Sequence, residues 1–276
     1  MERAVIRRKA TEHDGEARDG GVQSVDRALH IIETLAEDDE GYRLSDLAVR
    51  TGLSTSTAHR LLTTLEKRRF VQFDRTESKW HVGAKSFAVG ATFTRRRNFV
   101  AQATPYLRKL RDQTRETANL AVVDDESIIV LMRIESREIM RSLTKVGGRV
   151  AMVASGVGKA VLATYSNEDV SAIIHHHGMP RLTEKSVVRP GDLFKELEKI
   201  RRQGFAIDDE EACMGLRCIA AVVYNDCAEP LAAISVSGMT SRVTEARVPD
   251  LGRTVREVAA ELTIALGGVM PEAKPS

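Results

Sequence analysis

Helical spacing of apolar residues organises the N-terminal part of the chain. Residues 24–36 carry apolar side chains on one helical face, which predicts an amphipathic helix with Ser24 as its N-cap. The apolar positions of this face are Val25, Ala28, Leu29 and Ile32. The segment LSDLAVR at residues 44–50 predicts a second, shorter helix, because Ser45 and Asp46 place a hydroxyl and a negative charge at its start.

A third helix is predicted within TGLSTSTAHRLLTTLEKRRFV, residues 51–71, after a tight turn at Gly52. Ser54 or Thr55 can accept a hydrogen bond from the amides of its first turn. Its apolar face is predicted to contain Ala58, Leu61, Leu62 and Leu65. Its outward face is predicted to contain Ser56, Arg60, Thr63 and Lys67, with His59 beside them.

Two short β-type runs, FVQFD and KWHVG, follow the third helix and predict a hairpin. Three helices and a hairpin in this order predict a winged helix-turn-helix, whose last helix enters the DNA major groove. Residues 42–97 contain twelve Lys and Arg but four Asp and Glu, a net charge of +8 in a chain whose net charge is +2. A basic region within a nearly neutral chain is typical of phosphate binding. The alternative from the pattern alone is a helical bundle with a solvated polar face.

The remainder of the chain mixes strand-like and helix-like runs. GAKSFAVGATFTRRRNFV predicts a linker helix, and residues 99–117 predict another helix. The strand-like runs are NLAVVDD, SIIVLMRIE, IMRSLTKVG, CIAAVVYN and PLAAISVSG. The helix-like runs are SGVGKAVLATY, NEDVSAIIHHH, PGDLFKELEKIRRQG and PDLGRTVREVAAELTIAL. Strands surrounded by helices predict an α+β domain with an antiparallel central sheet.

These patterns divide the chain into four parts. We expect a mobile tail at 1–20, a winged helix-turn-helix domain at 21–83, a linker helix at 84–102 and the α+β domain at 103–270. Three cysteines without a CxxC pair favour a reducing cytoplasm over a disulfide framework. No run approaches the roughly 18 uninterrupted apolar residues of a membrane span, and no leader is evident, so we expect a cytoplasmic protein without a membrane partner.

Several motifs resemble those of one protein family. VQSVDRALHIIETL, GLSTSTAHRLLTTLEKRRFV, ASGVGKA, GFAIDDEEACMGLRCIAA and LAAISVSG closely resemble the IclR family of bacterial transcription regulators, over about residues 22–268. The chain is most similar to the isocitrate-lyase (glyoxylate bypass) regulator branch, whose members sense small 2-oxo acids. The resemblance implies a winged helix-turn-helix joined by a helix to a GAF-like effector-binding domain. It also implies a homodimer or homotetramer.

Two stretches suit an anion on chemical grounds. In PLAAISVSG, Ser235 and Ser237 share one face of a strand and can both donate to a carboxylate, although that face could also meet water. Ser155 and Gly156 open a helix whose free amides suit an anion, although they could form an ordinary cap. The resemblance implies an effector pocket formed by Gly156, Val157, Asp208, Leu216, Cys218, Ser235 and Ser237. We expect Val150, Met152 and Ile139 to supply an apolar wall or to belong to the core.

Val157 departs from the alanine expected in close relatives, and its bulk would narrow the pocket.

SGVGKA fails as a phosphate-binding loop, because Val153 stands where the motif needs glycine and Ala160 where it needs a hydroxyl. Cys218 could act as a nucleophile if a base such as His175, His176 or His177 lay beside it. The three histidines could also bind metal, but the sequence offers no supporting Cys or His spacing.

We therefore expect a DNA-binding transcription regulator, a repressor rather than an enzyme, with no cofactor, metal or catalytic residue. Ser56, His59, Arg60 and Thr63 are expected to read base edges of double-stranded operator DNA. Thr55, Lys67, Arg75 and Lys79 are expected to contact phosphates. The expected effector is a small carboxylate such as glyoxylate or pyruvate. The alternatives are an activator, an effector that is a larger sugar acid or aromatic acid, a Cys218-dependent enzyme, and an adaptor whose winged helix binds protein.

Overall fold

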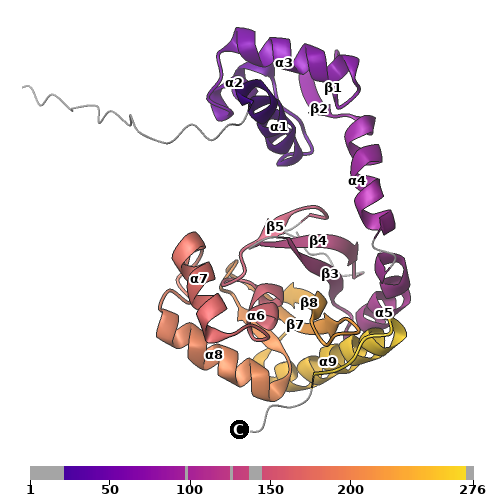
Figure 1. The fold of residues 1–276 in the computed structure, drawn as a ribbon, viewed down its shortest axis with the longest axis vertical. Coiled ribbons are helices and arrows are strands. Elements are labelled where there is room, and N and C mark those ends of the chain that lie inside the picture. The colour runs from indigo at the N-terminus through magenta and orange to yellow at the C-terminus, as the bar shows by residue number, and fades with distance from the viewer. Residues whose placement is uncertain (1–21, 97–98, 125–126, 137–144, 272–276) are drawn as a thin grey trace, which may run out of the picture. The chain divides into compact units, whose positions relative to one another are not determined.

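The structure is a computed structural model that describes residues 22–96, 99–124, 127–136 and 145–271 (Figure 1). The chain separates into two compact units, the first ending at Arg95 and the second beginning at Arg96. The expected tail at 1–20 lies outside the described residues, and so does most of the expected strand IMRSLTKVG at 139–147.

The N-terminal unit contains the three helices and the hairpin that the sequence predicts. The helices are α1 (Gln23–Ala36), α2 (Leu44–Arg50) and α3 (Thr55–Lys67), and the hairpin pairs β1 (Val71–Asp74) with β2 (Lys79–Val82) (Figure 1). The helix α4 (Ala84–Arg96) follows the hairpin, where the linker helix was expected. The core of the unit is formed by Ile31, Leu35, Tyr42, Leu47, Leu62, Val71 and Trp80. Tyr42 bridges to Trp80 through two backbone hydrogen bonds of 3.1 and 2.8 Å, so the segment before α2 extends the hairpin.

Two expectations for α1 are wrong. Ser24 does not cap the helix, because the N-cap is Val22 and no side chain bonds the first-turn amides. The predicted core stripe is also partly solvent-facing, with Val25 54% and Leu29 53% exposed. The helix instead buries Ile31 and Leu35. Two apolar stripes overlap on this helix, and periodicity alone does not tell which of them faces the core.

The second unit is built on a six-stranded sheet. Its strands are β3 (Thr117–Asp124), β4 (Ser127–Ile134), β5 (Arg149–Val150), β6 (Ala206–Asp209), β7 (Leu216–Tyr224) and β8 (Pro230–Met239). They run in the order β5-β4-β3-β8-β7-β6, and every neighbouring pair is antiparallel. The predicted α+β class and antiparallel sheet are confirmed. Strands β5 and β6 were not predicted, because runs of two and four residues carry too little alternation.

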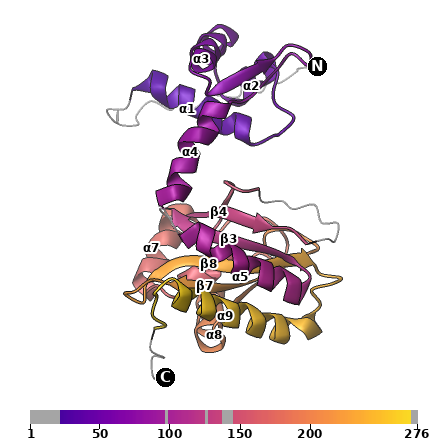
Figure 2. The ribbon, with the colours of Figure 1, turned by 90° about the vertical axis from the view of Figure 1, so that its right-hand side faces the viewer.

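Helices cover both faces of this sheet. Its helices are α5 (Phe99–Thr114), α6 (Gly156–Leu162), α7 (Asn167–His177), α8 (Pro190–Gln203) and α9 (Val248–Ala265), with a short turn η1 (Glu245–Arg247) before α9. One face packs against α5 and α9 through residues such as Leu107, Ile234 and Val255 (Figure 2). The other face packs against α6, α7 and α8 through residues such as Leu162 and Leu197. The expected helix at 99–117 ends at Thr114, because Thr117 begins β3.

The strand register places polar residues in neighbouring rows across the sheet. In one row Arg133 of β4 lies opposite Asn119 of β3, and Asn119 lies opposite Ser235 of β8. In the next row Ser237 lies opposite Cys218 of β7, and Cys218 lies opposite Asp208 of β6. Side chains two residues apart on a strand share a face, so Ser235 and Ser237 point the same way. This register assembles a site from five strands, of which β3 and β4 are distant in sequence from β6, β7 and β8.

Candidate functional site

A cavity of about 240 Å³ lies between this polar patch of the sheet and the start of α6. All seven residues expected in the effector pocket line it, namely Gly156, Val157, Asp208, Leu216, Cys218, Ser235 and Ser237. Of the three expected wall residues, Val150 lines the cavity, whereas Met152 is buried in the core instead. Ile139 lies outside the described residues. The lining also includes Asn119, Arg133 and Arg149, which the sequence analysis missed.

Asn119 connects the two ends of the polar patch. Its Nδ2 donates to Ser235 Oγ at 3.3 Å and to Ser237 Oγ at 3.4 Å. Its Oδ1 accepts from Arg133 Nε at 3.1 Å. Arg133 can only donate, so it fixes which end of the amide faces the serines. The serine oxygens accept from Asn119, and their hydroxyl hydrogens therefore point away from it. The sequence did offer one signal for Asn119, because it is a polar residue in the otherwise apolar run of β3.

Cys218 is a buried, protonated thiol. Burial, and to a smaller extent the nearby Asp208 charge, raise the pKa of the Cys218 thiol to about 11, although hydrogen bonds from Ser237 and Ser235 act against this rise. A nucleophilic cysteine needs a lowered pKa and an adjacent base. None of the described residues that line the cavity is a histidine. The site therefore suits Cys218 as a weak donor and packing surface, not as a nucleophile.

The pKa of the buried Asp208 carboxyl is raised toward neutral pH. Burial raises its pKa to about 6, although backbone amides and the charge of Lys159 favour the ionised form. The amides of Glu211 and Ala212 donate to Asp208 Oδ1 at 2.8 and 3.3 Å. The protonation of this group therefore responds to any charge that enters the cavity.

Lys159 of α6 forms a buried ion cluster with Glu196 and Glu211. The side chain of Lys159 is fully buried, and its Nζ lies 2.6 Å from Glu196 Oε1 and also bonds Glu211 Oε1. Burial opposes the charge of Lys159, but the two carboxylates together raise its pKa. Burial raises the pKa of Glu211 to about 7, with Lys159 acting in the opposite direction. The lysine of SGVGKA thus ties α6 to α8 (Glu196) and to the turn that follows β6.

The first turn of α6 forms one wall of the cavity. Ser155 caps it, accepting from Gly158 N at 3.1 Å and donating to Ala151 O at 2.7 Å. The amides of Gly156 and Val157 precede the first intrahelical bonds and have no carbonyl partner within the helix. A Cβ on Gly156 would lie 3.2 Å from both the Sγ and the carbonyl oxygen of Cys218, so glycine allows α6 to approach β7 closely.

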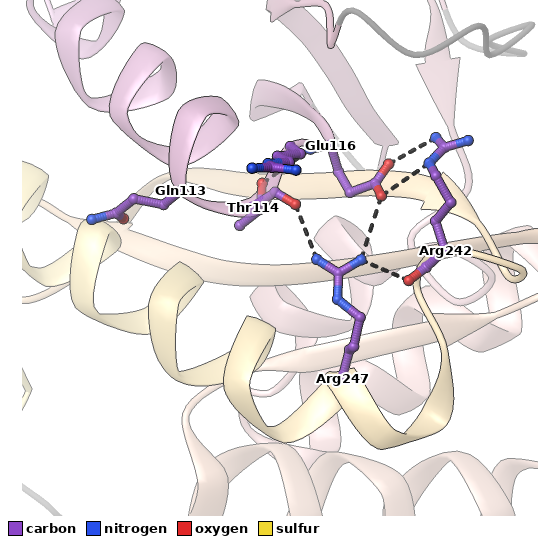
Figure 3. Close-up of a pocket in the computed structure, with 6 residues that line it drawn as sticks. Gln113, Thr114, Glu116, Arg242 and Arg247 are labelled. Atoms are coloured by element: carbon purple, nitrogen blue, oxygen red, sulfur yellow. Dashed lines mark hydrogen bonds and ion pairs between the residues drawn. The ribbon is translucent and has the colours of Figure 1, made fainter.

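A second, more open cavity of about 460 Å³ is lined by Gln113, Thr114, Arg115, Glu116, Arg242 and Arg247 (Figure 3). Glu116 is 1% exposed and sits between two arginines. Arg242 donates to it at 3.1 and 2.8 Å, and Arg247 Nη1 lies 3.7 Å from it. Arg247 also donates to the carbonyl oxygens of Thr114 and Arg242. The buried Glu116 carboxylate pairs with both arginines, and these contacts tie the segment between α5 and β3 to the segment after β8, which is a structural role.

The residues expected to contact DNA lie on α3 and the hairpin. Ser54 caps α3 by accepting from Thr57 N at 3.3 Å, so Ser54 rather than Thr55 starts the helix. The exposed members of the set are Thr55, Ser56, His59, Arg60, Lys67 and Arg75. Thr63 and Lys79 are half-buried, contrary to a fully outward placement of Thr63. Thr63 Oγ1 donates to His59 O at 2.8 Å, and Lys79 Nζ lies 3.3 Å from Glu77.

The described residues contain no group of three or more His, Cys, Asp or Glu side chains placed to hold a metal ion. His175, His176 and His177 lie in the last turn of α7, where their rings are 6.2 and 6.5 Å apart in sequence order. Within the same ranges no helix has the length and apolar character that a membrane crossing requires.

Comparison with known proteins gives matches along most of the chain. Residues 24–75 match the IclR helix-turn-helix domain, and residues 91–264 match the C-terminal domain of bacterial transcriptional regulators of the IclR type. The acetate operon repressor of Salmonella typhimurium is 41% identical over 251 residues, covering 90% of this chain and 92% of that protein. Transcriptional repressor IclR of Escherichia coli is 40% identical over 252 residues, covering 91% and 92%.

Solved structures share the fold. IclR of Thermotoga maritima has a TM-score of 0.72 at 24% identity, covering 88% of this chain and 98% of that one. An IclR homolog of Microbacterium hydrocarbonoxydans, complexed with 4-hydroxybenzoate, has a TM-score of 0.75 at 23% identity, covering 88% and 99%. The matched families and curated relatives are transcriptional regulators and not enzymes. Since both domain matches and both relatives agree, this chain belongs to the IclR family of bacterial transcriptional regulators.

Proposed function

We propose that this regulator is a repressor whose operator binding is controlled by a small carboxylate in the cavity between α6 and the sheet. The convergence of the seven residues Gly156, Val157, Asp208, Leu216, Cys218, Ser235 and Ser237 on this cavity carries the proposal. Two curated relatives at 40% identity or more are named repressors, which supports the sign of regulation. A more distant relative holds the carboxylic acid 4-hydroxybenzoate, which supports the ligand class.

The donors around the cavity suit a carboxylate. Asn119 occupies the acceptor side of Ser235 and Ser237 and leaves their hydroxyl hydrogens to the cavity and Cys218. Gly156 and Val157, whose amides have no carbonyl partner within α6, line the same space. Hydrogen bonds to an ionised acceptor are about twice as strong as neutral ones, so these donors favour a carboxylate over a neutral ligand.

The size of the cavity also supports a small effector. Its volume of about 240 Å³ lies just below the range of roughly 300–1,000 Å³ typical of sites for drug-sized ligands. Its apolar lining includes Ala121, Val130, Val150 and Val157. This apolar wall also suits a second class of effector, an aromatic acid whose ring would contact the valines.

For DNA, we propose that the exposed face of α3 enters the major groove. Ser56, His59, Arg60 and Thr63 would read base edges, and Arg60 suits guanine because its guanidinium can donate twice to one base. Thr55, Lys67, Arg75 and Lys79 would hold phosphates and set the register. Effector binding would favour one of two arrangements of a homodimer or homotetramer, and the helix α4 would carry that choice to the winged helices.

The test is fluorescence anisotropy with labelled DNA from upstream of the protein's own gene, at two salt concentrations, titrated with glyoxylate and with pyruvate. The expected result is sequence-selective, salt-dependent binding that a carboxylate weakens. The double variant Ser235→Ala, Ser237→Ala should bind DNA as the parent does and lose the effector response. Equal loss of both activities in that variant would assign the serines to folding and remove support for the pocket.

A further inference from the structure

We propose that Leu182 is a specificity-determining residue of this cavity, and that it selects small carboxylates that carry a short aliphatic chain. The inference rests on the proposed function of the cavity as an effector site. It adds a residue from the segment between α7 and α8, residues 178–189, which we call the strap. The predicted set of site residues contains no member of this segment.

The strap is attached to the turn after β6 by side-chain hydrogen bonds. Ser186 Oγ donates to Glu211 O at 2.8 Å. Thr183 Oγ1 donates to Glu210 O at 2.7 Å. Ser186 is itself buried, and its Oγ accepts from the backbone amides of Leu182 and Thr183 at 3.0 and 2.9 Å. These bonds fix the backbone at Leu182, so little conformational freedom remains to be lost when a ligand packs against its side chain.

Leu182 belongs to an apolar rim of the cavity. Ala212 and Leu216 line the cavity with it, and Ala212 directly follows Glu211, to which the strap is bonded. Leu182 is 53% exposed and the other two are half-buried, so all three keep apolar surface that a ligand can cover. Leu216 lies two residues before Cys218 on β7, about 7 Å along the same face of the strand. An aliphatic chain that covers this rim gains affinity in proportion to the apolar area removed from water.

The charges of the cavity orient a carboxylate so that its chain points toward the rim. The amides of Glu211 and Ala212 hold Asp208 Oδ1 at 2.8 and 3.3 Å, so Asp208 lies at the rim. Ser237 lies two strands away from Asp208, with Cys218 between them in the register. A carboxylate is repelled by the ionised Asp208 and attracted by the serine hydroxyls. The chain of the same ligand therefore extends toward Ala212 and Leu182.

The test uses isothermal titration calorimetry on the full chain with glyoxylate, pyruvate, 2-oxobutanoate and 2-oxopentanoate. These acids share a 2-oxo acid head and lengthen by one carbon at each step. The parent should bind more tightly along the series from pyruvate onward, by up to about 4-fold for each methylene that the rim buries. Leu182→Ala should flatten this series and leave the affinity for glyoxylate unchanged, because glyoxylate has no chain to reach the rim.

Met214→Ala is the matched control. Met214 is 54% exposed and lies in the turn between Ala212 and Leu216, but it is not among the described residues that line the cavity. This variant should show the same rise along the series as the parent.

Ser186→Ala tests whether the strap holds Leu182 in place. It keeps the leucine and removes its anchor, so it should flatten the series as Leu182→Ala does. The double variant Leu182→Ala, Ser186→Ala should lose no more than Leu182→Ala alone, because both changes remove the same contact.

Equal affinity of the parent for pyruvate, 2-oxobutanoate and 2-oxopentanoate would overturn the inference about Leu182 and leave the proposed function standing. Equal losses of glyoxylate and 2-oxopentanoate affinity in Leu182→Ala would also overturn it, because Leu182 would then only support the shape of the cavity. If no acid of the series binds, the proposed function fails and the inference about Leu182 fails with it.

Discussion

Cys218 lies directly opposite Asp208 in the antiparallel register of β6 and β7, and both side chains are buried against the same cavity. Burial is the main cause of the raised pKa of each group, to about 11 for the thiol and about 6 for the carboxyl. The thiol therefore stays neutral throughout the physiological range, and the carboxyl is the group of this pair that titrates near neutrality.

This pairing predicts that effector affinity rises as the pH falls. A carboxylate bound beside Asp208 disfavours its ionised form and raises its pKa above about 6, so binding takes up protons. Affinity should increase as the pH is lowered from about 8 through the Asp208 pKa. Calorimetry at one pH in two buffers of different ionisation enthalpy measures the proton uptake. Asp208→Asn should abolish the uptake, and an unchanged pH slope in that variant would assign it to another group.

Replacing Lys159 should lower the free energy of unfolding by an amount that depends on pH. Lys159→Met leaves Glu196 and Glu211 without their buried partner, a change that typically costs about 3–5 kcal/mol. The folded-state pKa of Glu211 is raised to about 7, so its stability contribution is present at low pH and lost as the pH rises through that value. The variant should therefore be more destabilised at about pH 8 than at about pH 5.5.

Urea unfolding followed by circular dichroism at the two pH values measures this difference. Lys195→Met serves as the control, because Lys195 is exposed on α8 and lies 3.7 Å from Asp192 in the same helix. Its effect should stay within about 0.5 kcal/mol at both pH values. A pH-independent loss in Lys159→Met would show that packing of the aliphatic stem, and not the charge, is what the cluster contributes.

On the DNA-binding unit, Arg60 and Lys67 should behave differently when each is replaced by alanine. Arg60→Ala should cost on the order of 1 to 3 kcal/mol and relax the preference at one operator position, if Arg60 reads a base. Lys67→Ala should weaken all sequences alike and reduce the slope of log affinity against log salt by about one. Anisotropy with an operator and its single-base variants separates these patterns. Arg60→Ala binding every sequence like the parent would remove Arg60 from the reading face.

The sequence predicted the class of fold because its longest periodic segments form the helices and strands that their apolar spacing indicates. Helices α3, α8 and α9 and strands β7 and β8 are long enough for spacing to define their type. The effector residues came from a family resemblance, and the cavity contains all of them. Asn119 and Arg133 could not be found in this way, because their role depends on the register between β3, β4 and β8.

The error on α1 has the same physical origin. Val25 and Leu29 lie at helical spacing, but the choice between two apolar faces is made by α3 and β2, which are distant in sequence. Thr63 also follows the outward spacing of α3, yet its hydroxyl bonds the His59 carbonyl and its side chain is half-buried. Local pattern defines the element, whereas tertiary contacts decide which side chains it presents.

The glycine at position 158 gives a test of how closely α6 must approach the segment before it. A Cβ on Gly158 would overlap the backbone of Met152, including its carbonyl oxygen, and backbone cannot move aside as a flexible side chain can. Gly158→Ala should therefore destabilise the second unit and shift the cavity wall formed by Gly156 and Val157. Overpacking of this kind typically costs about 1–3 kcal/mol.

Gly90→Ala on α4 is the matched control, because nothing lies within 4 Å of a Cβ added there. Alanine in a helix interior is more favourable than glycine by roughly 0.5–1 kcal/mol, so this variant should be slightly more stable than the parent. Thermal unfolding and effector titration of both variants give the comparison. If Gly158→Ala unfolds and binds effector like the parent, the contact between α6 and Met152 can relax. The start of α6 would then tolerate displacement, and the placement of the Gly156 and Val157 amides would not depend on this close approach.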